Sequence, residues 1–355
     1  MSTDVRLPLA DTEPGARPRE ETWGADFSGL IAGFAFAPQS APQALDSAGA
    51  IRLMQAHRDQ LPAGHFAWLH VDLAHAATVR WLERHADLPQ GFFEALGSPA
   101  RSTRVEREGD ALVAVVNDVM FDFDFDAGDL STLWICLDRG LVVTGRHQRL
   151  RSIDTLRTRI KRGETLQTPL QLLDFLLREQ CEVLTDIVRQ VTQRADEIED
   201  RLLAGRPSVQ RAALGSMRRL LVRLQRLMAP EPASLFRLLQ HPPTWVNEDE
   251  LQSLREVNEE FLVVLSDMAS LQERIKLLQE EVAAAVSEAT GRSLFMLTVM
   301  TVLALPINIL AGLFGMNVGG VPLAQHPHGF WIIAVLILVF GGIAAAWVSR
   351  TRGER

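Results

Sequence analysis

The sequence predicts an α+β domain followed by long helices and a two-helix C-terminal transmembrane hairpin. Three observations support this fold class. Short apolar runs alternate with helical patterns up to about residue 150, and helical periodicity dominates from residue 169. The apolar runs 294–314 and 330–348 each approach the roughly 20 residues that a helix needs to cross a bilayer. From Ser293 through Ser349 there is no Asp, Glu, Lys or Arg.

Residues 1–28 are predicted to form a disordered N-terminal tail. Up to Asp26 the chain is polar, contains Pro8, Pro14 and Pro18, and lacks the apolar core of a signal peptide. The folded part is therefore expected to begin near residue 29.

Residues 29–150 are predicted to form a cytosolic α/β domain. Short apolar runs indicate strands, and the segments Glu108-Gly109-Asp110 and Asp138-Arg139-Gly140 suit the turns of two hairpins. The predicted strands are 30–36, 66–72, 102–107, 111–118, 130–137 and 141–144, and the predicted helices are 74–86 and 90–96.

Three carboxylates lie close together within this domain. Asp122, Asp124 and Asp126 alternate with Phe residues, so a strand here would point all three carboxylates to one side. Clustered carboxylates suit Mg²⁺ or Ca²⁺, which predicts a cytosolic regulatory metal site. The alternative, which we prefer, is a solvated strand edge protected from aggregation by its charge.

Residues 151–246 are predicted to form a helical hairpin region. Pro169 and Pro207 each suit the first turn of a helix, which predicts helices 169–203 and 207–228. The second helix carries five Arg residues beside its apolar face. It could lie on anionic lipid, but we prefer a helix packed against its neighbours with a solvated Arg face. Four prolines between residues 230 and 243 break the pattern.

Residues 247–293 are predicted to form a long stalk helix. Glu248, Asp249 and Glu250 suit a helix start, and no Pro or Gly follows until Gly291. Because no cap precedes the next apolar run, we expect one helix to continue from the stalk into the membrane. Its heptad-like seam consists of Leu254, Phe261, Leu265, Met268, Ile275, Val282 and Val286.

The first predicted span, 294–317, carries a polar stripe. Residues at three- and four-residue steps share one face of a helix. A plain anchor does not need this face, so the stripe favours a pore-lining helix. The alternative is that Thr and Asn stabilise helix contacts in lipid by less than about 2 kcal/mol each. The stripe consists of Leu294, Thr298, Thr301, Leu305, Asn308 and Gly312.

Flanking charges predict the orientation of the two spans. Arg292 precedes the first span, and Arg350, Arg352 and Arg355 follow the second. Since positive residues remain on the cytoplasmic side, both termini are predicted to be cytoplasmic. The C-terminal Arg residues could repel cations at an inner mouth, but we prefer an anchor at lipid headgroups. The remaining segments are the periplasmic loop 318–329, the second span 330–349 and the basic cytosolic tail 350–355.

The periplasmic loop contains His326 and His328. Imidazole is a good Zn²⁺ ligand, which suggests a capture site for metal. Two His residues with no acid or thiol beside them fall short of four ligands, so a turn with two solvated imidazoles is the preferred alternative.

The end of the first span carries a motif. Gly315-Met316-Asn317, preceded by Pro306 and Ala311-Gly312 and followed by a short uncharged loop, resembles the signature of the CorA family of divalent-cation transporters. Other stretches are similar to the zinc-transporting ZntB branch, and the acidic loop residue usual in magnesium-selective members is missing. These stretches are Arg218-Arg219 leading to Met228-Ala229-Pro230, Trp245 followed by Glu248-Asp249-Glu250, and Gly319-Gly320-Val321-Pro322.

The resemblance implies a funnel-shaped homopentamer with a pore, spanning a bacterial inner membrane. Gly315, Met316 and Asn317 would form the selectivity region at the outer mouth, Asn308 a deeper polar ring, and Leu305 and Leu294 apolar girdles. From the residues alone, two helices per chain cannot enclose water, so a pore already requires a ring of subunits.

The resemblance also implies the cargo, which is Zn²⁺ taken up with or without coupling to protons. No tightly bound cofactor is expected, and the expected partners are identical subunits, lipid, divalent cations and protons. A Mg²⁺, Co²⁺ or Ni²⁺ channel, a zinc exporter and a membrane-anchored cytosolic sensor remain alternatives.

Bulk composition argues against other classes of protein. The 355 residues carry a formal net charge of -8, which gives no general reason to expect nucleic-acid binding. Cys136 and Cys181 are the only cysteines, so a disulfide framework and a thiolate-rich zinc site are excluded. The sequence contains no Gly-rich phosphate loop, nucleophile motif or metal-hydrolase spacing, so nothing in it favours an enzyme.

Overall fold

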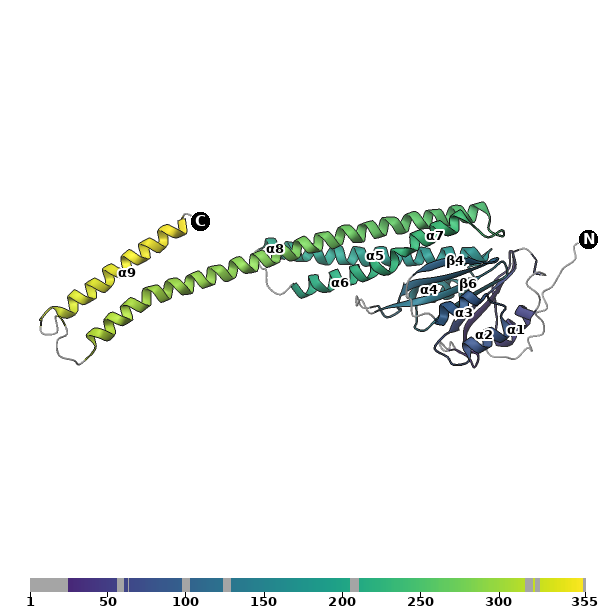
Figure 1. The fold of residues 1–355 in the computed structure, drawn as a ribbon, viewed down its shortest axis with the longest axis horizontal. Coiled ribbons are helices and arrows are strands. Elements are labelled where there is room, and N and C mark those ends of the chain that lie inside the picture. The colour runs from purple at the N-terminus through teal and green to yellow at the C-terminus, as the bar shows by residue number, and fades with distance from the viewer. Residues whose placement is uncertain are drawn as a thin grey trace, which may run out of the picture. The chain divides into compact units, whose positions relative to one another are not determined.

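The computed structural model describes residues 25–55, 61–62, 64–97, 103–123, 129–204, 211–316, 322 and 326–353, with the backbone alone from residue 344. The chain divides into two compact units, Met1–Ala204 with Gln210–Leu278, and Gly205–Val209 with Gln279–Arg355. Figure 1 shows the helices and strands of each.

The first unit contains a mixed sheet in the order β2-β1-β3-β7-β6-β5-β4. β3 and β7 pair in parallel, and the other neighbours pair antiparallel. Gly109, at φ 64°, lies in the turn of the β4–β5 hairpin, where a side chain would strain the backbone. The strands are β1 (Leu30–Phe36), β2 (Gln43–Ala44), β3 (Phe66–Asp72), β4 (Arg104–Glu108), β5 (Ala111–Val119), β6 (Leu130–Leu137) and β7 (Leu141–Arg146).

Apolar side chains cover both faces of this sheet. Val113 and Val115 of β5 join a core with Leu82 and Phe92 from the helices between the strands. Leu112, Ala114 and Val116 alternate with them along β5 and are also buried. α4 and α5 contact β5 as well. The helices of this part are α1 (Ser47–Gln55), α2 (Thr78–His85), α3 (Gln90–Gly97) and α4 (Arg151–Lys161).

The long helices begin with explicit caps. The Thr168 side chain accepts a hydrogen bond from the Gln171 N–H, and Pro169 occupies the first turn of α5. At the start of α8, Asn247 Oδ1 accepts from the Glu250 N–H and Glu250 Oε2 accepts from the Asn247 N–H, both at 2.9 Å. These helices are α5 (Pro169–Leu203), α6 (Arg211–Met228), α7 (Pro230–Gln240), α8 (Glu248–Phe314) and α9 (Gly329–Gly353).

In the first unit, α5 and α8 run alongside one another (Figure 1). Arg178 of α5 forms ion pairs with Glu256 and Glu260 of α8 at 3.4 and 3.1 Å. Most of the predicted seam of α8 is buried, since Leu254, Phe261, Met268 and Ile275 are each 0% exposed. Leu265 is only partly buried and Val286 is 43% exposed, so the prediction is wrong at these two positions. The prediction of one uninterrupted helix through the stalk is confirmed by the bounds of α8.

Several expectations from the sequence are wrong in detail. The prolines at 230–232 do not end the helical structure, because Pro230 lies in the first turn of α7, where its missing N–H costs no hydrogen bond. A strand does not continue from β5 through Phe121–Phe123, because the Phe123 N–H donates to the Met120 carbonyl at 3.2 Å and closes a turn. The elements β2, α1 and α4 were not predicted, and the helix expected at 74–86 begins only at Thr78.

Candidate ion-permeation site

The C-terminal third of α8 is an exposed apolar surface. Among the described residues, α8 is the one helix long and apolar enough to cross a membrane, and none of its most apolar stretch is buried. Leu294 and Leu305 are 59% and 57% exposed. An apolar surface of this extent is stable only against lipid or protein. α9 is also apolar over Gly329–Ile343, where the sequence predicts the second span.

The polar stripe lies on the exposed part of α8, with Thr298, Thr301 and Asn308 all exposed. Thr298 Oγ1 donates to the Leu294 carbonyl at 2.8 Å, and Thr301 Oγ1 donates to the Leu297 carbonyl at 2.9 Å. Because each hydroxyl proton is used inside the helix, the outward-facing hydroxyl lone pairs act as hydrogen-bond acceptors. The stripe therefore presents uncharged oxygen atoms that can accept hydrogen bonds.

Pro306 and the glycines modify this stretch. Pro306 lies inside α8 and has no N–H to donate to the Val302 carbonyl one turn earlier. The helix therefore lacks one of its regular backbone hydrogen bonds at Pro306, within the stretch that carries the stripe. A Cβ atom on Gly312 would meet no atom within 4 Å. Packing within the single chain therefore does not require a glycine at this position.

The motif residues Gly315 and Met316 follow the end of α8. The Gly315 N–H donates to the Ala311 carbonyl at 2.9 Å, and a Cβ on Gly315 would lie 3.0 Å from that oxygen. Glycine therefore suits this end of the helix, where a side chain would crowd the carbonyl oxygen of the preceding turn. Met316 is 51% exposed. Asn317 lies outside the described residues.

His326 and His328 are exposed and lie close together. Their ring centroids are 6.1 Å apart, and the His328 N–H donates to His326 Nδ1 at 3.2 Å. This bond occupies Nδ1 of His326 and leaves its Nε2 as the nitrogen available to a metal. In the part of the chain that the structure describes, no group of three or more His, Cys, Asp or Glu side chains could hold a metal ion.

The other predicted residues are placed only in part. Asp122 is exposed in the turn after β5, and Asp124 and Asp126 lie outside the described residues. Arg350 and Arg352 belong to the helical backbone of α9. Arg355 lies outside the described residues.

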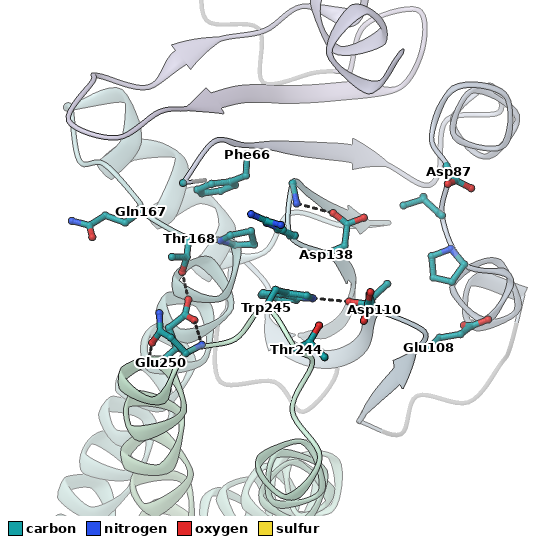
Figure 2. A pocket seen from close by; sticks show the side chains of 18 of the residues that line it. Phe66, Asp87, Glu108, Asp110, Asp138, Gln167, Thr168, Thr244, Trp245 and Glu250 are labelled. Carbon is teal, nitrogen blue, oxygen red and sulfur yellow. Dashed lines mark hydrogen bonds between the residues drawn. The ribbon is translucent and has the colours of Figure 1, made fainter. Parts of the chain in front are cut away.

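The sequence did not predict a polar cavity of about 1140 Å³ in the first unit. Figure 2 shows Trp245 in its centre, with Nε1 donating to the Asp110 carbonyl at 2.7 Å. Its carboxylates already hold parts of the chain in place, since Asp138 Oδ1 accepts from the N–H groups of Gly140 and Leu141 at 2.9 and 2.8 Å. Glu250 closes the α8 cap and bonds Thr168. Trp245 and Glu250 therefore have structural roles beside this cavity, since both form hydrogen bonds that hold segments of the chain together.

Sequence reasoning also missed a buried carboxyl group, Glu231, between the sheet and the helices. Its signal in the sequence is a carboxylate between Pro230 and Pro232, at the start of a helix that was not predicted.

Comparison with known proteins gives the class of the protein. A family model described as "CorA-like Mg2+ transporter protein" matches residues 63–350. The α/β unit, the long helices and the charge-free end of α8 define a membrane transporter of divalent metal ions. The chain belongs to the CorA-like Mg²⁺ transporter family. The description of this family and the names of its curated relatives are those of transporters.

Curated relatives and solved structures are similar over most of the chain. The zinc transport protein ZntB of Enterobacter sp. (strain 638) is 25% identical over 312 residues, 87% of this chain and 94% of that protein. The structure of full-length CmaX has a TM-score of 0.75 and 25% identity, and covers 92% of this chain and 99% of CmaX. The CorA magnesium transporter from Methanocaldococcus jannaschii has a TM-score of 0.71 at 19% identity, with 90% of this chain and 98% of that chain covered.

Proposed function

We propose that the chain is one subunit of a homopentameric pore, lined by α8, through which Zn²⁺ enters a bacterial cell. The observation that carries this proposal is the row of uncharged acceptors on the exposed end of α8, namely Thr298, Thr301 and Asn308. The name of the curated relatives, zinc transport protein, supports Zn²⁺ as the cargo. The ion is a substrate here, and no resident cofactor is proposed.

The chemistry of the stripe suits a cation that keeps its water. Divalent ions hold their hydration shell strongly, and stripping it requires charged or tightly fitting ligands. No Asp, Glu, Lys or Arg occurs from Ser293 through Ser349. Neutral oxygens can accept hydrogen bonds from the water shell and bind weakly enough to release the ion.

The outer end of α8 would set selectivity. In the proposed ring, Gly315, Met316 and Asn317 of each subunit surround the outer mouth, and Asn308 forms a second polar ring. Leu294 and Leu305 form narrow apolar girdles, where the pore can close by losing its water. Both exposed leucines fit a surface that requires a partner.

The orientation rests on the flanking charges. With Arg292 before the first span and Arg350, Arg352 and Arg355 after the second, α8 and α9 would form a hairpin with both termini in the cytoplasm. In this arrangement the three C-terminal Arg residues lie at lipid headgroups. The first unit then faces the cytosol of an inner-membrane protein.

A regulatory and a capture site complete the proposal. His326 and His328 would meet incoming Zn²⁺ at the rim through imidazole nitrogens contributed by several subunits. Asp122, Asp124 and Asp126 are the candidate for a cytosolic site that binds a divalent ion through carboxylate oxygens, while a solvated, charge-protected segment remains the preferred interpretation of these residues. Each site is expected to tune transport rather than to form the pore.

Mg²⁺ is the second candidate cargo. It is favoured by the description of the family model and by the magnesium transporter among the similar structures. Co²⁺ and Ni²⁺ belong to the same candidate activity. The missing acidic residue in the loop 318–329 favours Zn²⁺ over this alternative.

Flux into proteoliposomes tests the proposal. Purified chain would be reconstituted, and uptake of Zn²⁺, Mg²⁺, Ni²⁺ and Co²⁺ compared with and without an imposed pH difference. We expect Zn²⁺ to enter fastest, and a response to the pH difference would identify proton coupling. Faster entry of Mg²⁺ would identify Mg²⁺ rather than Zn²⁺ as the cargo. The absence of flux for all four ions would contradict a pore.

A further inference from the structure

Glu231 lies where four elements of the first unit meet. It occupies the first turn of α7 and is 1% exposed. Thr103 next to β4 and Gln180 of α5 contact it directly. Thr103 Oγ1 also lies 3.1 Å from the Leu227 carbonyl at the end of α6, so its single hydroxyl proton is shared between that oxygen and Glu231. The carboxyl group therefore joins the edge of the sheet to three helices.

Its two oxygens are satisfied unequally. Oε1 accepts hydrogen bonds from Gln180 Nε2 at 3.1 Å and from Thr103 Oγ1 at 3.3 Å. Oε2 is buried and has no hydrogen-bond partner among the described residues. An ionised carboxylate with one bare oxygen is much more costly to bury than a neutral acid.

No cation compensates for the charge. The described part of the chain holds no ion pair to Glu231 and no Lys, Arg or His in hydrogen-bond contact with it. The titratable groups that face it are Asp118 of β5 and Cys181 of α5. Asp118 is itself a buried carboxyl group, held by the N–H and hydroxyl groups of Ser152. A charge on Glu231 would thus meet the like charge of Asp118 and neutral hydrogen-bond partners among the described residues named here.

We propose that Glu231 is a proton-binding site, and that loss of its proton loosens the α6–α7 turn from the β4–β5 edge of the sheet. Gln180 connects Glu231 to the sheet, because its Nε2 donates both to Glu231 and to the Asn117 carbonyl of β5. Burial is the largest cause that raises the pKa of Glu231, to about 8, with hydrogen bonds from Gln180 and Thr103 opposing it. The site is therefore occupied by a proton at neutral pH and empties in mild alkali. This inference does not depend on which ion the protein carries.

The sign of the pH effect follows from proton binding. In the unfolded chain the carboxyl group loses its proton near its ordinary pKa of 4.5, whereas the folded chain keeps it up to about 8. Between these values the folded state binds more protons, so stability falls as pH rises and levels off above about pH 8. Replacing Glu231 by Gln removes this dependence, because the neutral amide resembles the protonated acid.

The test compares thermal unfolding of the full-length chain in detergent for wild type and Glu231→Gln from about pH 5 to about pH 9. We expect similar midpoints at the acidic end and a clearly higher midpoint for the variant at the alkaline end. Glu197→Gln, an exposed carboxyl change on α5, serves as the control and should follow wild type. A variant that is less stable than wild type by the same amount at every pH would overturn the proposal.

A second measurement uses the wild-type chain and holds even if the variant does not fold. Hydrogen exchange of peptides from α7 and β4 would be followed at about pH 6 and about pH 9, corrected for intrinsic exchange rates. Peptides from β3, in the centre of the sheet, provide the internal reference. We expect protection of α7 and β4 to fall at least several-fold more than that of β3. Equal behaviour of all three elements would overturn the proposal.

Discussion

Thr298 Oγ1 donates a hydrogen bond to the carbonyl oxygen of Leu294, at 2.8 Å, on an exposed face of α8. The bond fixes the hydroxyl proton inside the helix and leaves oxygen lone pairs facing outward. Thr301 repeats the arrangement with Leu297 at 2.9 Å. This is how the charge-free end of α8 can present a line of acceptors to water that surrounds a cation.

We expect Thr298→Val to slow Zn²⁺ flux in proteoliposomes. The change keeps the shape of the side chain but removes the acceptor, which is worth roughly a fivefold change, or about 1 kcal/mol, for each hydrogen bond lost. Thr298→Ser keeps the hydroxyl and is the matched control. Equal flux in the Val and Ser variants would show that the stripe does not contact the ion's water.

The buried seam of α8 predicts a large effect at Phe261, which is 0% exposed. Phe261→Ala leaves a cavity and should lower the free energy of unfolding by about 3–5 kcal/mol. Its neighbour Leu262 is 52% exposed, so Leu262→Ala should change that free energy by less than about 0.5 kcal/mol. Denaturant unfolding of the solubilised chain measures both, and equal losses would contradict the packing of α8.

The reciprocal cap of α8 predicts a smaller loss of stability. Asn247→Ala removes the acceptor of the Glu250 N–H and should cost about 1 kcal/mol. Glu248→Gln, at an exposed position in the same turn, is the control. If thermal unfolding shows both variants to be as stable as wild type, the cap does not contribute to folding.

His70 predicts a loss of stability in acid. Its Nε2 accepts a hydrogen bond from Arg146 Nε at 2.9 Å, so protonation there would break the bond. Burial, followed by the charges of Arg146 and Arg157, lowers the pKa of His70 well below its ordinary value of 6.5. Below about pH 6.5 His70 is therefore protonated in the unfolded chain but still neutral in the folded chain. The free energy of unfolding should then decrease as the pH is lowered.

His70→Gln tests this prediction, because a neutral amide can still accept from Arg146. Unfolding midpoints measured between about pH 7 and about pH 5 should fall less steeply for the variant than for wild type. Parallel curves would contradict a neutral, buried His70. His85→Gln is the control, since His85 is only partly buried.

The two exposed loop histidines predict an effect on zinc uptake. If His326 and His328 capture Zn²⁺, replacing both by Ala should lower Zn²⁺ flux into proteoliposomes, because the imidazole nitrogens that meet the ion are lost. Unchanged zinc uptake by the double variant would retire the capture site.

Local signals in the sequence predicted much of the fold. α5 begins at Pro169 and ends at Leu203 as expected, because Pro169 follows a capping Thr168 and apolar residues recur at helical steps. β1 and β3 match their predicted ranges, since continuous apolar runs suit strands covered on both faces. α7 was missed because its prolines were interpreted as helix breakers rather than as first-turn residues.

Of the candidate sites, one could be predicted from local sequence signals and the other could not. The stripe on α8 could be predicted because Thr298, Thr301 and Asn308 belong to one helix with a fixed period. The surroundings of Glu231 could not, because Thr103 and Gln180 are 128 and 51 residues away along the chain. Periodicity carries no information on such contacts. A pore formed by several chains likewise depends on surfaces that one chain leaves exposed.

Zn²⁺ flux into proteoliposomes by a variant with both Asn308 and Asn317 replaced by Ala tests the pore most directly. Thr290→Val, on α8 ahead of the charge-free segment, controls for effects on the helix itself. The proposed pore predicts that the double variant inserts and assembles normally but loses most of its flux, while the control keeps it. Flux equal to wild type in the double variant would contradict a pore lined by α8 and leave this helix as a membrane anchor.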